Sequence, residues 1–234
     1  MQENPDISIW TVPIARWALW DVTAQENSSP SPTELGFIEP MLRRRLSSLA
    51  KMALKVAHDC VHDLPAVRFV YASRHGELTR TTSMLDDLAA EESISPTAFN
   101  MAVLNASPGL FSILRRDTTS TTAISASSES FGYGLLEAYI QMVQDPTRPV
   151  LLVYADEPAP DVYGCIEPKD SSPHAIGLLL HSGAANIIAC TSRPNHQTVS
   201  HESQSRAFLR CLEGASESSW HGVGKSWAWS RQSQ

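Results

Sequence analysis

The chain has 234 residues, of which 42% are hydrophobic and 18% charged, and its 25 acidic and 18 basic residues give a formal net charge of −7. This length allows one large domain or two small ones around a sizeable core. The acidic balance excludes nucleic acid as the main partner, because no basic face could neutralise phosphates. No apolar run reaches membrane-spanning length, and the N-terminus lacks the basic and apolar regions of a signal peptide. We therefore expect a cytoplasmic protein without membrane insertion.

The first hundred residues predict an alternation of strands and helices. Residues 7–22 are apolar and Trp-rich and contain the first strand. Pro40 begins a helix whose apolar residues follow a 3.6-residue period as far as Cys60. A short strand follows at Val67–Ala72, and then a helix at Gly76–Glu91. The apolar side of that helix is predicted to consist of Leu78, Met84, Leu85 and Leu88.

The alternation continues after Ser95, which we place as an N-cap before Pro96. The next predicted elements are the helix Leu110–Leu114, the strand Ser120–Ile124, the helix Phe131–Val143 and the strand Val150–Tyr154. A closing pair of strands joined by Ser182-Gly183 and a last helix are predicted at Ala175–His181, Ala185–Cys190 and Glu202–Leu212. The tail, residues 215–234, has no predicted structure.

Strands separated by helices predict an α/β fold with a layered, mostly parallel sheet that ends in an antiparallel pair. Helices are expected on both faces of this sheet. We expect the whole chain, residues 1–234, to form a single domain.

The cysteines and histidines predict neither a disulfide framework nor a metal site, and no cofactor is expected. The cysteines form no Cys-x-x-Cys pair and are expected to be reduced and mostly buried: Cys60, Cys165, Cys190 and Cys211. His58 and His62 have the i, i+4 spacing that can bind a metal on a helix, but no third ligand accompanies them. Surface histidines are therefore the favoured interpretation.

One segment suggests a family. Residues 118–138 read Thr-Thr-Ser-Thr-Thr-Ala-Ile-Ser-Ala-Ser-Ser-Glu-Ser-Phe-Gly-Tyr-Gly-Leu-Leu-Glu-Ala. They resemble the β-ketoacyl synthase segment in which a strand leads into Thr-Ala-Cys-Ser-Ser-Gly and a small-residue helix. Val67–Leu78 and Ser95–Ile113 are similar to two further blocks of that family, in the same order. The resemblance implies the N-terminal half of a thiolase-like fold.

More narrowly, the chain resembles the stand-alone ketosynthase-like chain-length factors of aryl polyene pathways. It shares with them Arg43–Arg45 after the first loop and the strand sequence of Pro149–Pro158. This resemblance implies a catalytically silent subunit that pairs with a full-length, Cys-containing ketosynthase in polyketide-like or fatty-acid-like biosynthesis. The acyl chain would be delivered by an acyl carrier protein.

The resemblance places Ser128, or Ser127 after a slip of one residue, where ketosynthases have the nucleophilic cysteine. The family's catalytic histidines come from a second half that this chain does not match. A lone serine is a weak nucleophile without an adjacent base, and the chain has no Gly-x-Ser-x-Gly elbow. The favoured role of the hydroxyl is to cap the helix that begins near Phe131.

The resemblance also implies where the partner binds and what shapes its acyl tunnel. The predicted interface is the uncharged strand made of Thr119, Ser120, Thr121, Thr122, Ala123 and Ile124, which would pair antiparallel with the partner's matching strand. The alternative is a central core strand. The predicted tunnel-shaping residues are Phe99, Met101, Phe111, Phe131 and Tyr133.

Two other functions remain open at this stage. One is a small serine-dependent acyl hydrolase or acyltransferase that uses Ser128. The other is a scaffold that docks the carrier protein through Arg43, Arg44 and Arg45, although a solvated helix face is the favoured reading of that basic run.

Overall fold

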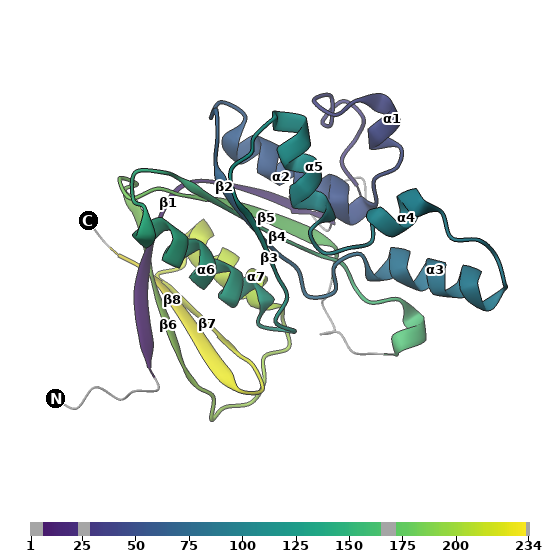
Figure 1. The fold of residues 1–234 in the computed structure, drawn as a ribbon. Coiled ribbons are helices and arrows are strands. Elements are labelled where there is room, and N and C mark those ends of the chain that lie inside the picture. Colours follow the sequence, from purple (N-terminus) through teal and green to yellow (C-terminus); the bar gives the residue numbers. More distant parts are fainter. Residues whose placement is uncertain (1–6, 23–28, 165–171, 233–234) are drawn as a thin grey trace.

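The computed structural model describes residues 7–22, 29–164 and 172–232, and these form an eight-stranded sheet with helices on both faces (Figure 1). The strands are β1 (Ser8–Asp21), β2 (Arg68–Ala72), β3 (Thr121–Ile124), β4 (Val150–Asp156), β5 (His174–Leu180), β6 (Asn186–Pro194), β7 (Glu217–His221) and β8 (Lys225–Arg231). The helices are α1 (Pro40–Arg43), α2 (Ser48–Val61), α3 (Leu78–Ala89), α4 (Pro96–Asn100), α5 (Ala106–Arg115), α6 (Ser130–Gln144) and α7 (Gln204–Glu213), with the short 3-10 helix η2 (Asp161–Tyr163). None of these helices is long and apolar enough to cross a bilayer.

The strand order is β3-β2-β4-β5-β1-β6-β8-β7. Only β2 pairs in parallel, with β3 and with β4, while the other pairings are antiparallel. The predicted α/β class with helices on both faces is confirmed, but the prediction of a mostly parallel sheet is wrong. Helices between strands reveal where strands lie along the chain, and they do not reveal which strands become neighbours.

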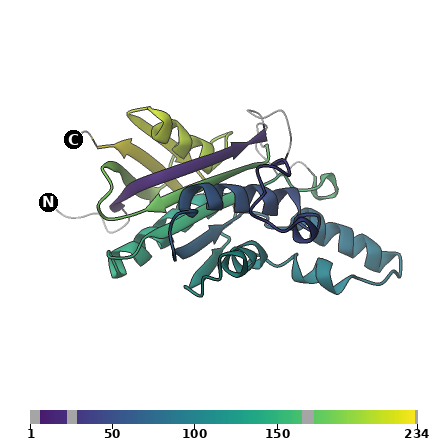
Figure 2. The same ribbon diagram turned by 90° about the horizontal axis from the view of Figure 1, so that it is seen from above.

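The predicted closing pair is also wrong in its pairing. β5 and β6 are separated by β1, which pairs antiparallel with both of them. β1 is 14 residues long, and its register shifts between Ile14 and Arg16. It thereby joins the main part of the sheet to a second part made of β6, β8 and β7, which we call the wing (Figure 2).

The wing explains the Trp-rich tail that had no predicted structure. Trp220, Trp227 and Trp229 are buried on β7 and β8. Together with α6, α7 and one face of the main sheet they form a single core cluster, because the sheet curves around the two helices. Helices α6 and α7 are thus covered by sheet residues on more than one side.

The other face of the sheet is covered by α2 and α5. Alternate residues of β2 explain how one strand serves both faces, because Val70 faces the α6 cluster and Phe69 faces the α2 cluster. The helix predicted to run from Pro40 to Cys60 is in fact interrupted. Ser47 Oγ accepts the backbone N–H of Ala50 at 2.9 Å and thereby begins α2 as a separate helix.

Candidate functional site: the turn between β3 and α6 and the open edge of β3

The turn between β3 and α6 is held by Ser130. Its Oγ accepts the N–H of Ala126 at 2.8 Å and donates to the carbonyl oxygen of Ser127 at 2.7 Å. Ser127 has a positive φ of 52°, which is unusual for a residue other than glycine. The predicted cap by Ser128 is wrong, because α6 begins at Ser130 behind Glu129 and has no side-chain cap.

Helix α7 and the wing together close the N-terminal turn of α6. The N–H of Gly132 donates to Gln204 Oε1 at 2.7 Å, and Trp227 Nε1 donates to Glu129 Oε2 at 3.0 Å. A Cβ on Gly132 would lie 2.7 Å from Gln204 Nε2 and 2.9 Å from the Trp227 ring. Glycine is therefore required here by the close approach of the wing.

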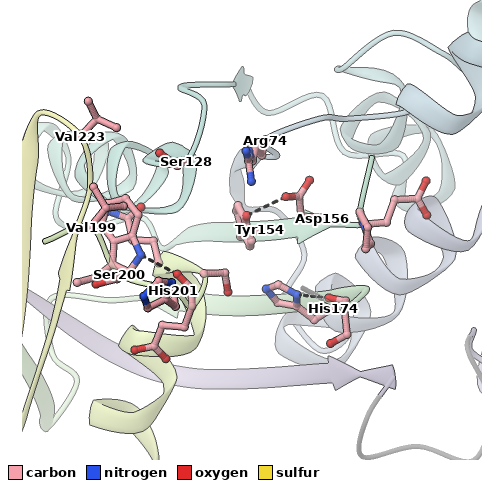
Figure 3. Close-up of a pocket in the computed structure, with 16 residues that line it drawn as sticks. Arg74, Ser128, Tyr154, Asp156, His174, Val199, Ser200, His201 and Val223 are labelled. Atoms are coloured by element: carbon pink, nitrogen blue, oxygen red, sulfur yellow. Dashed lines mark hydrogen bonds between the residues drawn. The ribbon is translucent and has the colours of Figure 1, made fainter. Parts of the chain in front are cut away.

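A cleft of about 330 Å³ lies between this turn and the wing (Figure 3). Its lining includes Arg74, Ser128, Tyr154, Asp156, His174, His201 and Trp220. The side chains come from the turns after β2 and β3, the end of β4, the start of β5, the loop before α7 and strand β7. The cleft thus opens where the resemblance places the lost nucleophile.

The polar groups of the cleft hold one another in place. The buried Asp156 carboxylate accepts the N–H of His75 at 3.2 Å, Ser73 Oγ at 3.3 Å and Tyr154 Oη at 3.2 Å. Burial raises the pKa of Glu157, as do the nearby carboxylates of Glu77 and Asp156. The cleft wall is therefore a network of internal hydrogen bonds and acidic groups.

His174 is not arranged as a base for Ser128. Its Nδ1 lies 2.8 Å from Ser172 O and its Nε2 lies 2.7 Å from Ser205 Oγ, so both ring nitrogens are engaged elsewhere. Burial lowers its pKa and favours the neutral ring. Figure 3 shows Ser128 across the cleft from His174 and His201. This geometry gives no support to a serine nucleophile.

The second feature is the open edge of the sheet. Among the strands that the structure describes, β3 is the first in the sheet order and pairs only with β2, so the alternative of a central core strand is wrong. The strand is shorter than predicted, since Thr119 and Ser120 precede it, and the N–H of Thr119 donates to Asp117 Oδ1 at 2.9 Å. Within β3, Thr121 is exposed and Thr122–Ile124 are half-buried.

An apolar groove of about 310 Å³ runs between this edge and α6, lined by Ile124, Ala126, Tyr133, Leu136, Glu137 and Ile140. Exposed apolar side chains continue on both sides of the strand. Val143 on α6 is 54% exposed and Ile113 on α5 is 71% exposed. We call the strand edge, the groove and these two flanking side chains together the edge surface.

The structure brings only some of the predicted tunnel residues together. Tyr133 lines the groove, while Phe131 and Phe111 are buried in the two core clusters on opposite faces of the sheet. Phe99 is exposed on α4, and Met101 beside it is half-buried. Phe131 still lies behind the cleft, since its ring centroid is 5.7 Å from that of the cleft residue Tyr154.

The basic run is not a uniform charged face. Arg43 donates to the carbonyl oxygens of Pro32 at 2.7 Å and Leu35 at 3.3 Å, while Arg44 and Arg45 are exposed. His58 stacks on Phe37 with ring centroids 3.9 Å apart. No group of three metal-binding side chains occurs within the ranges that the structure describes.

Of the cysteines, Cys60, Cys190 and Cys211 are buried free thiols, as predicted, and Cys165 lies outside the described residues. Burial raises the pKa of Cys60 to about 12. These thiols are therefore core residues rather than nucleophiles.

Sequence reasoning missed most of the edge surface. The sequence gives the appearance of an ordinary core helix to the apolar residues Leu136, Ile140 and Val143. The neighbouring residues in the sequence do not show whether an apolar side of a helix is exposed or buried. The i, i+4 and i+7 spacing from Leu136 was a usable signal, since a helix with a second apolar stripe must cover two surfaces. Asp156 also carried a signal, because it ends a fully buried strand.

The sequence profile of the β-ketoacyl synthase N-terminal domain matches residues 17–230. The chain belongs to this family. Among solved structures it is similar to a chain of the ketosynthase (ApeO) in complex with its chain length factor (ApeC) from Xenorhabdus doucetiae. The identity is 30% and the TM-score 0.80, and the alignment covers 95% of this chain and 100% of that one.

Two further solved structures, which are less similar in sequence, share the fold of this chain. The ishigamide ketosynthase/chain length factor matches with 14% identity and a TM-score of 0.58, over 87% of this chain and 72% of that one. A β-ketoacyl synthase from Burkholderia phymatum STM815 matches with 11% identity and a TM-score of 0.54, over 85% of this chain and 62% of that one. No curated protein matches the chain. The thiolase-like ketosynthase fold is thus confirmed.

Proposed function

We propose that the chain is a non-catalytic chain-length factor that forms a heterodimer with a full-length, Cys-containing ketosynthase. The pair works in the cytoplasm on acyl chains carried by an acyl carrier protein, in aryl polyene or related polyketide-like or fatty-acid-like biosynthesis. The observation that carries this proposal is the edge surface, in which an unpaired strand edge is flanked on both sides by exposed apolar side chains.

An open edge of this kind favours pairing with another strand. Proteins protect edge strands with charges, prolines or bulges, and Thr121–Ile124 contains neither a charge nor a proline. The groove beside it offers apolar area that pairing would bury. The groove is lined mainly by the apolar and aromatic side chains of Ile124, Tyr133, Leu136 and Ile140, as the core of an interface commonly is.

The similarity to a ketosynthase and chain length factor complex supports the identity of the partner. Antiparallel pairing of β3 with the matching strand of a ketosynthase would join two sheets about a pseudo-twofold axis. The segment from Thr119 to Ile124 would then lie at the centre of the interface. The same arrangement favours a subunit role over an independent hydrolase.

The proposed effect on chain length follows from volume. Tyr133 in the groove, together with Phe99 on α4 and Met101 beside it, would meet the partner and narrow its acyl tunnel. Phe131 and Phe111 are buried and would act indirectly, by fixing the positions of the tunnel-wall residues that they contact. Larger side chains at a tunnel floor stop elongation sooner.

The first experiment is co-expression with a cognate ketosynthase, followed by size-exclusion chromatography with mass detection. We expect a one-to-one complex, which Ile140→Asp disrupts because a charge would be buried in the groove. The matched control Val223→Asp changes an exposed side chain on the wing and should leave the complex intact. A wild-type chain that elutes as a monomer beside the ketosynthase would refute the proposal.

A further inference from the structure

The wing reaches the groove of the edge surface through one aromatic side chain, that of Tyr133. This side chain lines the groove, and its ring also lies against two residues of β8. The ring centroids of Tyr133 and Trp227 are 5.3 Å apart with an interplanar angle of 79°, which is an edge-to-face contact. Lys225 Nζ lies 5.3 Å from the centroid of the Tyr133 ring, within the range of a cation–π contact. A groove residue is thus held from outside its own helix.

Trp227 is itself fixed on several sides. It is fully buried, and its Nε1 donates to Glu129 Oε2 at 3.0 Å. The ring of Trp10 meets it edge-on, with 5.9 Å between the ring centroids. A Cβ on Gly132 would lie 2.9 Å from the indole, so α6 also lies directly against it. The indole of Trp227 therefore forms a rigid boundary for the Tyr133 ring.

Lys225 contributes a charge to the same contact. It lies two residues before Trp227 on β8, and residues two apart in a strand point to the same face of the sheet. Its side chain is half-buried and, within the described part of the chain, forms no ion pair with a carboxylate. The negative face of the Tyr133 ring is therefore what attracts its ammonium group.

These contacts matter because a tyrosine on a helix has more than one position open to it. Its χ1 angle has two common values in a helix, and each directs the ring to a different part of the surface. Tyr133 is half-buried, so α6 alone does not enclose its ring. Groups outside the helix then decide which position is populated. Trp227 and Lys225 favour the position in which the ring lines the groove.

We infer that Trp227 and Lys225 are positioning residues that hold the Tyr133 ring in the groove and thereby help to set the product length. The inference rests on the proposed function, in which Tyr133 narrows the acyl tunnel of the ketosynthase. It gives β8 a role beyond its place in the core cluster. The wing adjusts chain length through Tyr133, without itself touching the acyl chain.

The first test follows the Tyr133 ring directly, by fluorine NMR of the full-length chain labelled with 3-fluorotyrosine. The chain has five tyrosines, and Tyr133→Phe identifies the resonance of interest. We expect Lys225→Met to shift this resonance and to leave the other four in place, because it removes the charge and keeps an unbranched side chain. Lys225→Arg keeps a cation and should stay close to the wild type. A Tyr133 resonance that is identical in the wild type and in Lys225→Met would overturn the inference.

The second test measures product length in the complex with the ketosynthase. We expect Trp227→Phe and Lys225→Met each to raise the proportion of products with one further elongation about threefold, as the loss of one such ring contact would. The matched control is Trp20→Phe, which changes a buried tryptophan in the core cluster on the other face of the sheet. It should leave the product length unchanged, and equal lengthening in this control would overturn the inference.

A comparison of double variants separates positioning from a general loosening of the core. Tyr133→Ala should itself lengthen the products. Adding Lys225→Met or Trp227→Phe to it should change nothing further, because both residues act through the ring that has been removed. Lengthening by these two changes that is equal with and without the Tyr133 ring would overturn the inference.

The outcomes also distinguish this inference from the proposed function. Longer products from Tyr133→Ala, with none from Lys225→Met and Trp227→Phe, would overturn the inference and leave the proposed function standing. Unchanged product length in Tyr133→Ala, in a complex that has formed, would refute tunnel shaping by Tyr133 and the inference with it. A wild-type chain that forms no complex at all would refute the heterodimer and the inference together.

Discussion

Gln141 on α6 is hydrogen-bonded to Thr122 on β3, with its Nε2 3.1 Å from the threonine Oγ1. The same Nε2 lies 2.7 Å from Glu137 Oε1, one turn earlier on α6. The end of α6 is fixed in turn by Arg68, whose Nη2 donates to Asp145 O at 2.7 Å. The open strand and its neighbouring helix are thus arranged before any partner binds, which lowers the entropic cost of association.

Loss of the bond between Gln141 and Thr122 should weaken both the fold and the heterodimer. We expect Thr122→Val to lower the free energy of unfolding by about 1 kcal/mol, since it removes one side-chain hydrogen bond, and Gln141→Leu to lower it by about 2 kcal/mol, since it also removes the bond to Glu137. The double variant should cost less than the sum of the two, measured by urea denaturation. Strict additivity would show that the contact carries no energy.

Replacement of the buried phenylalanines tests the control of product length. Phe131→Ala and Phe111→Ala each empty a core site and should cost about 3–5 kcal/mol of stability. In complexes that still assemble, we expect the ketosynthase to make longer products without loss of condensation. The measurement is the product-length distribution of the co-expressed pair.

The control for that experiment is Phe208→Ala. Phe208 is fully buried on α7, and its ring centroid lies 4.9 Å from that of Phe131. Its loss therefore disturbs the core cluster that contains Phe131, from the side of α7. Longer products from all three variants would indicate that a general loosening of the core lengthens the products, and not a specific effect of Phe131 and Phe111. Unchanged length in both Phe131→Ala and Phe111→Ala would contradict tunnel shaping by these residues.

Ser128→Ala should leave assembly and product length unchanged, because no described base is arranged to activate this hydroxyl. Ser127→Ala makes the same test for the alignment shifted by one residue, in which Ser127 takes the nucleophile position, and should give the same result. A serine-directed phosphonate should not label the wild-type chain. Labelling that disappears in Ser128→Ala would favour the acyl hydrolase or acyltransferase instead.

Glu77 should make the protein less stable as the pH rises. Burial raises the pKa of this carboxyl, although Ser47 Oγ donates to it at 2.7 Å and Arg80 lies near it. A carboxyl whose pKa is raised in the folded state contributes to stability when it is protonated. This contribution is fully present below the unfolded-state pKa of about 4.3, and it is lost as the pH rises through the folded-state pKa.

The variant Glu77→Gln isolates this effect, because its amide oxygen can still accept from Ser47. We expect a flatter dependence of the unfolding free energy on pH than in the wild type, measured by denaturation between about pH 4 and pH 8. An identical pH dependence in the two proteins would contradict the assignment to Glu77.

Much of the fold could be predicted from local pattern, and the pairing of its strands could not. The sequence shows the 3.6-residue period of apolar residues in α2 and the proline that begins α4. It also shows the apolar runs of β2 and β4. The place of β1 between β5 and β6 depends on contacts between segments about 170 residues apart in the chain. The strands β7 and β8 were missed because Ser and Trp alternate there without the usual β-branched residues.

The candidate site was predicted in part. Ser128 lines the cleft and β3 lies at the sheet edge, while the roles assigned to them from the sequence stay predictions. The groove was not predicted, because exposure of Ile140 and Val143 depends on which elements leave α6 uncovered. The exposure of Leu85 and Leu88 on α3 was not predicted for the same reason, because they have the spacing of core residues.

The central claim is that the open edge of β3 is the contact with the ketosynthase. Hydrogen–deuterium exchange of residues 119–125, compared between the free chain and the purified complex, tests it most directly. We predict strong protection of this segment on binding, because strand pairing would engage amide groups that the free edge leaves open. Unchanged exchange there, in a complex that has formed, would contradict the account.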